Sequence, residues 1–189
     1  MTPFPATGAR YRNPFLGETF IFTHMDEAAD ACQFDCLIER GGMQTGTGRQ
    51  HFHPNADEIF TVVKGSLKLM VDGRWEMLGP GEARRVPRGT PHLFRNGHDG
   101  ETLVRVRFEP GADFLRYFLN MAMNLTNHPE WYDEQGEPPL LLTALRLHAY
   151  RNHAYGDGIP VWFQKLLFAV LSPVARLRGY RLEVAPRRR

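Results

Sequence analysis

Between residues 18 and 109 the chain alternates short apolar runs with turn-forming residues. Residues 66–71 alternate apolar and polar positions and end at Asp72-Gly73, a dipeptide that favours a two-residue β-hairpin turn. Short strands separated by frequent turns favour an antiparallel sandwich or barrel over a parallel sheet. By this pattern we expect strands at residues 18–23, 34–39, 58–63, 66–71, 75–78, 82–86, 91–95 and 102–108.

After residue 110 the apolar spacing becomes helical. The apolar side chains that indicate the first helix are Phe114, Leu115, Phe118, Leu119 and Met123. Residues 140–150 predict a second helix. A third begins at Pro160, since proline is favourable in a first turn, and continues to Arg178, where Gly179 is a suitable stop.

The chain has 189 residues, which favours one domain with an extension. The prediction is a mainly β fold in three parts. Residues 1–17 form an arm, irregular because of its prolines and glycines. Residues 18–110 form the barrel, and residues 111–189 form a helical C-terminal extension.

The net charge of +2 hides an asymmetry. Residues 1–139 carry 14 Lys and Arg against 19 Asp and Glu, whereas residues 140–189 carry nine against two. Docking of the two parts on each other explains this difference, and so does contact with an anionic surface.

Cys32 and Cys36 are too few for a disulfide framework, which favours a reduced, cytoplasmic protein. On a strand they share a face, but two thiols alone make a poor metal site, and we expect small buried apolar residues. Residues 1–11 lack the apolar core of a secretory signal, and no run is apolar and long enough to predict a transmembrane helix.

Two motifs carry the candidate chemistry. In the first, His51 and His53 flank one residue, four residues separate His53 from Glu58, and six more precede Gly65. The second motif consists of Gly81, Pro87, Gly89, His92 and Asn96. On a strand His51 and His53 point to one face, whereas Glu58 has the opposite parity. A turn at Pro54-Asn55 would reset the register and bring Glu58 inward.

If His92 comes from another strand, three imidazoles and one carboxylate meet inside the barrel. We therefore predict a metal site of His51, His53, Glu58 and His92. That donor set suits one divalent transition metal, namely Mn, Fe, Co, Ni, Cu or Zn. Ordinary polar residues at a barrel mouth are the competing explanation. The other histidines lack such spacing, and we expect them on the surface or on helices: His24, His98, His128, His148 and His153.

The two motifs resemble the two-part signature of the cupin superfamily, over about residues 36–109. One position departs, since Thr45 stands where the signature has glycine. The resemblance implies a double-stranded β-helix, the jelly-roll barrel, holding a metal at the four residues above. The segment that begins Arg12-Asn13-Pro14 and the apolar residues 158–173 resemble bacterial cupin-domain proteins of unknown function, which imply no particular reaction.

Alternation along the strands predicts an apolar pocket beside the metal, with plain core packing as the alternative for each residue. The inward candidates are Phe60, Val62, Leu67, Leu69, Phe94, Val104, Val106 and Phe108. Arg105 and Arg107 alternate with them and are expected outside. Gln44 and Arg49 precede the first motif and are candidates for contacts around the metal or its ligand.

Three functions compete for this donor set. The resemblance to quercetin-type dioxygenases implies a metal-dependent oxygenase or related metalloenzyme acting on a small organic substrate, with Glu58 as a possible base. The alternative is a non-catalytic module that binds a small ligand and docks through its tail. A sugar-nucleotide epimerase is disfavoured, because those relatives work without a metal.

The third helix, in the apolar and basic residues 158–189, is too short to span a bilayer between Lys165 and Arg176. It would cover the barrel, form a dimer interface, or lie on a membrane. On a membrane, Trp162 and Phe163 would sit at the boundary and basic residues would face lipid phosphates. These residues are Lys165, Arg176, Arg178 and Arg181. We expect a homodimer, because cupins commonly pair through barrel faces, and no nucleic-acid partner.

Overall fold

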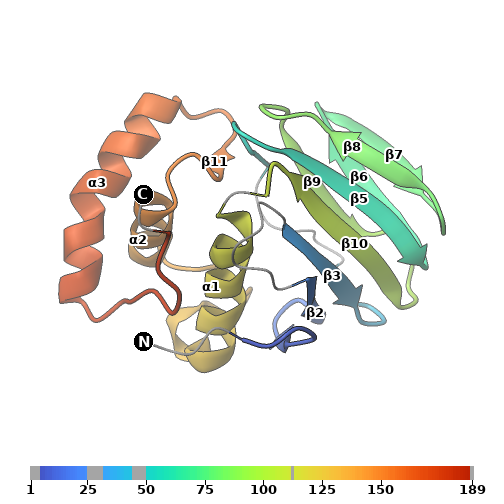
Figure 1. The fold of residues 1–189 in the computed structure, drawn as a ribbon, viewed down its shortest axis with the longest axis horizontal. Helices are drawn as coiled ribbons and strands as arrows, with labels where there is room; N and C mark the ends of the chain where they lie inside the picture. The colour runs from blue at the N-terminus through green and yellow to red at the C-terminus, as the bar shows by residue number, and fades with distance from the viewer. Residues whose placement is uncertain (1–4, 25–31, 44–49, 112, 188–189) are drawn as a thin grey trace.

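The computed structural model describes residues 5–24, 32–43, 50–111 and 113–187. Gln44 and Arg49, the candidates for contacts around the metal, lie outside these ranges. A barrel of antiparallel strands stands beside a group of helices (Figure 1). This arrangement confirms the mainly β jelly roll with a helical extension.

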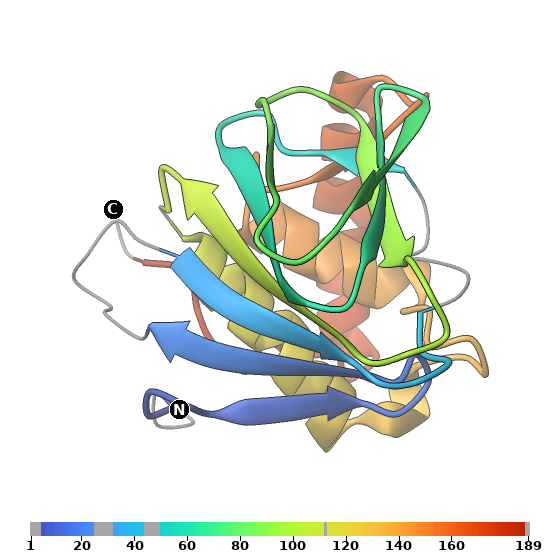
Figure 2. The ribbon, with the colours of Figure 1, turned by 90° about the vertical axis from the view of Figure 1, so that its right-hand side faces the viewer.

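Two sheets form the barrel, and every strand pairing is antiparallel. In Figure 2 the sheets are seen from the barrel side. In sheet order, the six-stranded sheet consists of β1 (Arg10–Asn13), β2 (Glu18–His24), β3 (Cys32–Ile38), β10 (Thr102–Glu109), β5 (Asp57–Lys64) and β8 (Ala83–Val86). The five-stranded sheet consists of β11 (Tyr155–Gly156), β4 (His51–Phe52), β9 (His92–Asn96), β6 (Leu67–Val71) and β7 (Arg74–Leu78).

The extension contains the three predicted helices. They are α1 (Phe114–Asn127), α2 (Leu140–Ala149) and α3 (Val161–Leu177), with a short 3-10 helix, η1 (Pro129–Trp131), between the first two. Helix α1 packs against β1 and β3, and α2 packs against α3. Within the described residues, none of the helices combines the length and apolar character needed to cross a membrane.

Two turns show why the strands end where they do. Asp72 and Gly73 have φ values of 48° and 75°, the left-handed pair that a tight β-hairpin requires, and they join β6 to β7 as predicted. Gly65 has a φ of 79°, and a Cβ there would lie 2.5 Å from Oγ1 of Thr102. The glycine that ends the first motif is therefore required by close packing against β10.

Two short strands differ from the sequence prediction. The arm over residues 1–17 is not wholly irregular, because Arg10–Asn13 forms β1 and pairs with β2. Tyr155–Gly156 forms β11, which pairs with β4 and adds a strand from the extension to the barrel. A two-residue strand has no period, so the sequence pattern could not reveal it.

The core is continuous from the barrel into α1. Phe108 of β10 stacks on Phe114 of α1, with ring centroids 4.3 Å apart. Cys32 and Cys36 are free, buried and on one face of β3, as expected. All eight inward candidates are buried: Phe60, Val62, Leu67, Leu69, Phe94, Val104, Val106 and Phe108. Arg105 and Arg107 face outward, where Arg105 pairs with Asp35.

Candidate metal centre

The turn at Pro54-Asn55 brings Glu58 to the histidines. It carries the chain from β4 in one sheet to β5 in the other. Glu58 therefore faces back across the barrel, whereas a continuous strand would have pointed it away from His51 and His53. The predicted change of register is what the structure shows.

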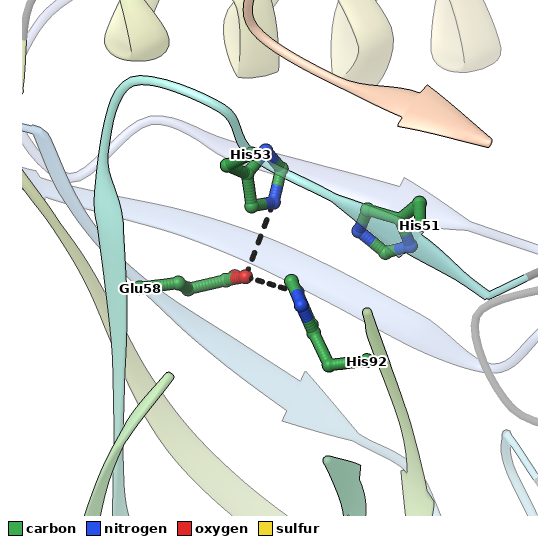
Figure 3. Close-up of side chains that lie close together, drawn as sticks. All are labelled: His51, His53, Glu58 and His92. Atoms are coloured by element: carbon green, nitrogen blue, oxygen red, sulfur yellow. Dashed lines mark hydrogen bonds and ion pairs between the residues drawn. The ribbon is translucent and has the colours of Figure 1, made fainter. Parts of the chain in front are cut away.

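Four side chains converge inside the barrel (Figure 3). One ligand atom from each of His51, His53, Glu58 and His92 lies within 4.8 Å of all the others. Oε2 of Glu58 is 2.7 Å from Nε2 of His92 and 3.2 Å from Nε2 of His53. His53, Glu58 and His92 are buried, and His51 is half-buried. This group could hold one metal ion.

Backbone carbonyls orient two of the imidazoles. Nδ1 of His92 donates to the carbonyl of Thr90 at 2.9 Å, and Nδ1 of His53 donates to the carbonyl of His153 at 2.6 Å. A carbonyl can only accept, so in each ring the proton is on Nδ1 and Nε2 faces the centre. Hydrogen bonds of this kind fix the tautomer of histidines that bind metals.

The nitrogen and oxygen atoms at the centre need a proton or a cation between them. With its Nδ1 protonated, a neutral His92 would place the Nε2 lone pair 2.7 Å from a carboxylate oxygen. Two acceptors at that distance repel each other unless a proton or a metal ion lies between them. Nε2 of His53 is also buried, and no residue in the described ranges offers it a well-directed hydrogen bond. A bound cation satisfies both nitrogens, so the donor set fits a metal.

Electrostatics agree with this arrangement. Burial disfavours the charged form of Glu58, but the adjacent His53 and His92 stabilise it and hold the pKa of Glu58 well below its usual range. Burial disfavours the charged form of His92 too, yet Glu58 raises the pKa of His92 above its ordinary value. The carboxylate is therefore ionised and available as a ligand.

A cavity of about 320 Å³ opens over the donors. His51, His53 and Glu58 line it. Of the predicted pocket residues, Phe94 and Val106 line the cavity. The other six candidates are buried in the barrel core and do not line the cavity: Phe60, Val62, Leu67, Leu69, Val104 and Phe108.

Much of the cavity wall comes from the extension, and the sequence pattern did not predict these lining residues. Tyr117 and Phe118 of α1, Arg146 of α2 and Tyr155 of β11 line this wall. His153, predicted to lie on the surface or a helix, supplies the carbonyl that orients His53. These residues lie far from both motifs in sequence, and nothing in their spacing indicates a site.

The comparisons with known proteins support the barrel and its motifs. The family model described as "Cupin domain" matches residues 38–108, the stretch that contains all four donors. Residues 38–108 are therefore similar to the cupin domain, in sequence as well as in fold. The match ends before α1, so the extension lies outside the cupin domain.

Similar proteins cover only parts of this chain. An uncharacterized protein from Aquifex aeolicus is 33% identical over 63 residues, which are 33% of this chain and 51% of that protein. Quercetin 2,3-dioxygenase from Bacillus subtilis is 27% identical over 85 residues, 45% of this chain and 25% of that protein. The match therefore spans about half or less of these relatives. Among solved structures, KdgF from Halomonas sp. has a TM-score of 0.46 at 21% identity, covering 59% of this chain and 97% of that chain.

Proposed function

We propose that this cupin holds one divalent transition metal at His51, His53, Glu58 and His92 and acts on a small organic molecule in the adjoining cavity. The observation that carries the proposal is the convergence of four donors, three of which line a mostly apolar cavity. An ion held by four protein ligands keeps positions for other ligands if it prefers octahedral geometry.

The chain's own residues prepare the site for chemistry. A bound ion would supply Lewis-acid or redox chemistry. His53 and His92 are held in one tautomer, and Phe94 and Val106 contribute apolar wall to the cavity. Glu58 is the candidate base, because it is ionised and opens onto the cavity.

We further propose oxygenase chemistry, which the similarity to quercetin 2,3-dioxygenase over 85 residues supports. The alternative is a module that binds a small ligand without converting it. Oxygen uptake with flavonols, diketones and catechols separates the two. Consumption by the metal-loaded chain supports an oxygenase, whereas a co-purified organic ligand that is never turned over supports the binding module.

Metal content tests the shared part of both functions. We expect elemental analysis of protein purified from its own host to give one transition metal per chain. His92→Ala should lose most of it, because His92 is buried at the centre. The matched control is His24→Ala, whose histidine is exposed on β2. Equal metal in both variants would refute the proposed site.

The extension supports a second role at its outer surface. Helix α3 exposes an apolar stripe of Trp162, Leu166, Val170, Val174 and Leu177. Arg176 and Arg178 are exposed at the end of the same helix. Apolar side chains beside positive charge are typical of helices that lie on anionic membranes. We propose peripheral contact with such a surface.

Flotation with phosphatidylserine-containing vesicles tests this contact. The wild type should float with them, and the double variant Leu166→Glu/Val170→Glu should not. Met77→Glu is the control, since Met77 is equally exposed on the barrel. A wild type that stays unbound contradicts membrane contact. A double variant that changes only the oligomeric state assigns the stripe to the proposed homodimer instead. The cytoplasmic location, the domain bounds and the absence of a nucleic-acid partner stay predictions.

A further inference from the structure

The cavity over the metal donors is also lined by a positively charged side chain. Arg146 of α2 lines the cavity, yet its side chain is only 5% exposed. Arginine stays charged at any ordinary pH, so this is a buried cation. Its position in the extension, outside the cupin domain, sets it apart from the two motifs.

Arg146 lacks the partners that a buried guanidinium needs. Its one hydrogen bond runs from Nη2 to Oη of Tyr132 at 3.2 Å. Nε is buried and has no hydrogen-bond partner in the part of the chain that the structure describes. No carboxylate among those residues forms an ion pair with it. Glu137 lines the same cavity but is exposed, and its backbone N–H bonds to Asp133.

A buried charge without a counter-charge is costly, and proteins keep one where a ligand completes the pair. The planar fork of a guanidinium matches the two oxygens of a carboxylate. Arg146 therefore has the chemistry of an anchor for an organic acid.

Tyr117 lines the same cavity as Arg146 and Glu58. Burial raises the pKa of its phenol, the positive charge of Arg146 opposes that rise, and the negative charge of Glu58 adds to it. The apolar wall of this cavity includes Phe118 and Leu147. Three of the metal donors and Arg146 therefore face one shared cavity of about 320 Å³.

We propose that Arg146 binds the carboxylate of the ligand, and that the ligand class is a small monocarboxylic acid with an apolar body. This inference rests on the proposed function, because it assigns the substrate class of the same cavity. Arg146 is a specificity-determining residue in this scheme, and the barrel donors supply the metal.

Matched acids and amides test the anchor. Binding of phenylacetate and octanoate is compared by calorimetry with that of phenylacetamide and octanamide, using the full chain both metal-loaded and metal-stripped. We expect at least one acid to bind about 10-fold more tightly than its amide, the worth of one hydrogen-bonded charge pair. The preference should persist without metal, because Arg146 and not the ion provides it.

Arg146→Met should abolish the preference and leave the binding of the amide unchanged. Its metal content should equal that of the wild type, and its melting temperature should be equal or higher, since an unpaired buried charge has been removed. Arg146→Lys keeps the charge but not the fork, and should weaken the acid more than the amide.

Each contrary result overturns the anchor. These results are equal binding of acids and amides by the wild type, a preference that survives in Arg146→Met, a preference that disappears with the metal alone, and a markedly lower melting temperature of Arg146→Met, which would make Arg146 a structural residue. Loss of metal from His92→Ala leaves the acid preference measurable. The proposed metal site and the anchor can therefore fail separately.

Discussion

The barrel and the helical extension contribute to one cavity in different ways. The barrel supplies all four donor side chains, and their spacing in the sequence is regular enough to predict. The extension supplies other lining residues, the carbonyl that orients His53, and the buried Arg146. The comparison teaches that the barrel provides the four candidate metal donors, while the extension provides much of the cavity wall beside them.

The largest expected effect comes from separating the two regions. Phe108 of β10 stacks on Phe114 of α1 and also meets the edge of the His53 ring. Phe108→Ala removes a fully buried ring at this junction, so we expect the free energy of unfolding to fall by about 3–5 kcal/mol. Chemical denaturation measures it.

Met77→Ala is the control for that variant, because Met77 is exposed on β7 and should change stability by about 0.5 kcal/mol or less. If the two variants cost the same, the barrel and the extension do not share a core.

The next effect is on metal affinity, and it comes from removing one donor of the barrel. Glu58→Gln loses the single carboxylate of the centre, and we expect metal affinity to fall by more than the ~10–100-fold that loss of a ligand's hydrogen-bond partner costs. Competition with a chromogenic chelator measures the affinity. Glu101→Gln, on an exposed glutamate paired with Lys64, is the control. Unchanged affinity in Glu58→Gln would remove Glu58 from the site.

A weaker and more remote effect tests the extension's support of the centre. Gln164 of α3 is buried, accepts from the N–H of Gly156 and donates to the carbonyls of Gly156 and Ile159. It thereby holds β11 against β4, the strand that carries His51.

Gln164→Ala should cost about 1–3 kcal/mol of stability and lower metal affinity by about 10-fold, although it touches no donor. Gln135→Ala, on an exposed glutamine, is the control. Affinity that stays equal in a destabilised Gln164→Ala would show that the extension covers the centre without orienting it.

The smallest effect is a pH dependence within the barrel. Burial raises the pKa of Glu18, while Cys36 and Asn13 partly oppose the rise. The folded state thus favours the protonated form, and this stabilisation is present below the usual pKa of glutamate and lost as the pH rises through the raised value.

Glu18→Gln should therefore gain stability relative to wild type as the pH rises across about 4 to 8, measured by melting temperature. Glu39→Gln is a control of opposite sign, because Arg12 lowers the pKa of the half-buried Glu39. A constant difference between Glu18→Gln and wild type would contradict the burial of an ionisable Glu18.

The sequence predicted the barrel better than it predicted the position of the extension. Alternation and turn residues predicted the barrel strands, since each hairpin is decided within a few residues, as Asp72-Gly73 shows. Pro54-Asn55 similarly explained how Glu58 turns inward. The helices were recognisable from apolar spacing. Their placement was not, because the contact between His53 and His153 joins residues 100 positions apart. The helical spacing of apolar residues does not indicate that an arginine such as Arg146 is buried.

The most direct test of the central claim is the K-edge X-ray absorption spectrum of the metal-loaded chain. The four barrel donors predict a single ion with nitrogen and oxygen neighbours only and the multiple scattering of three imidazoles. A sulfur neighbour would move the ion to Cys32 or Cys36, and absence of imidazole scattering would show that His51, His53 and His92 do not bind it.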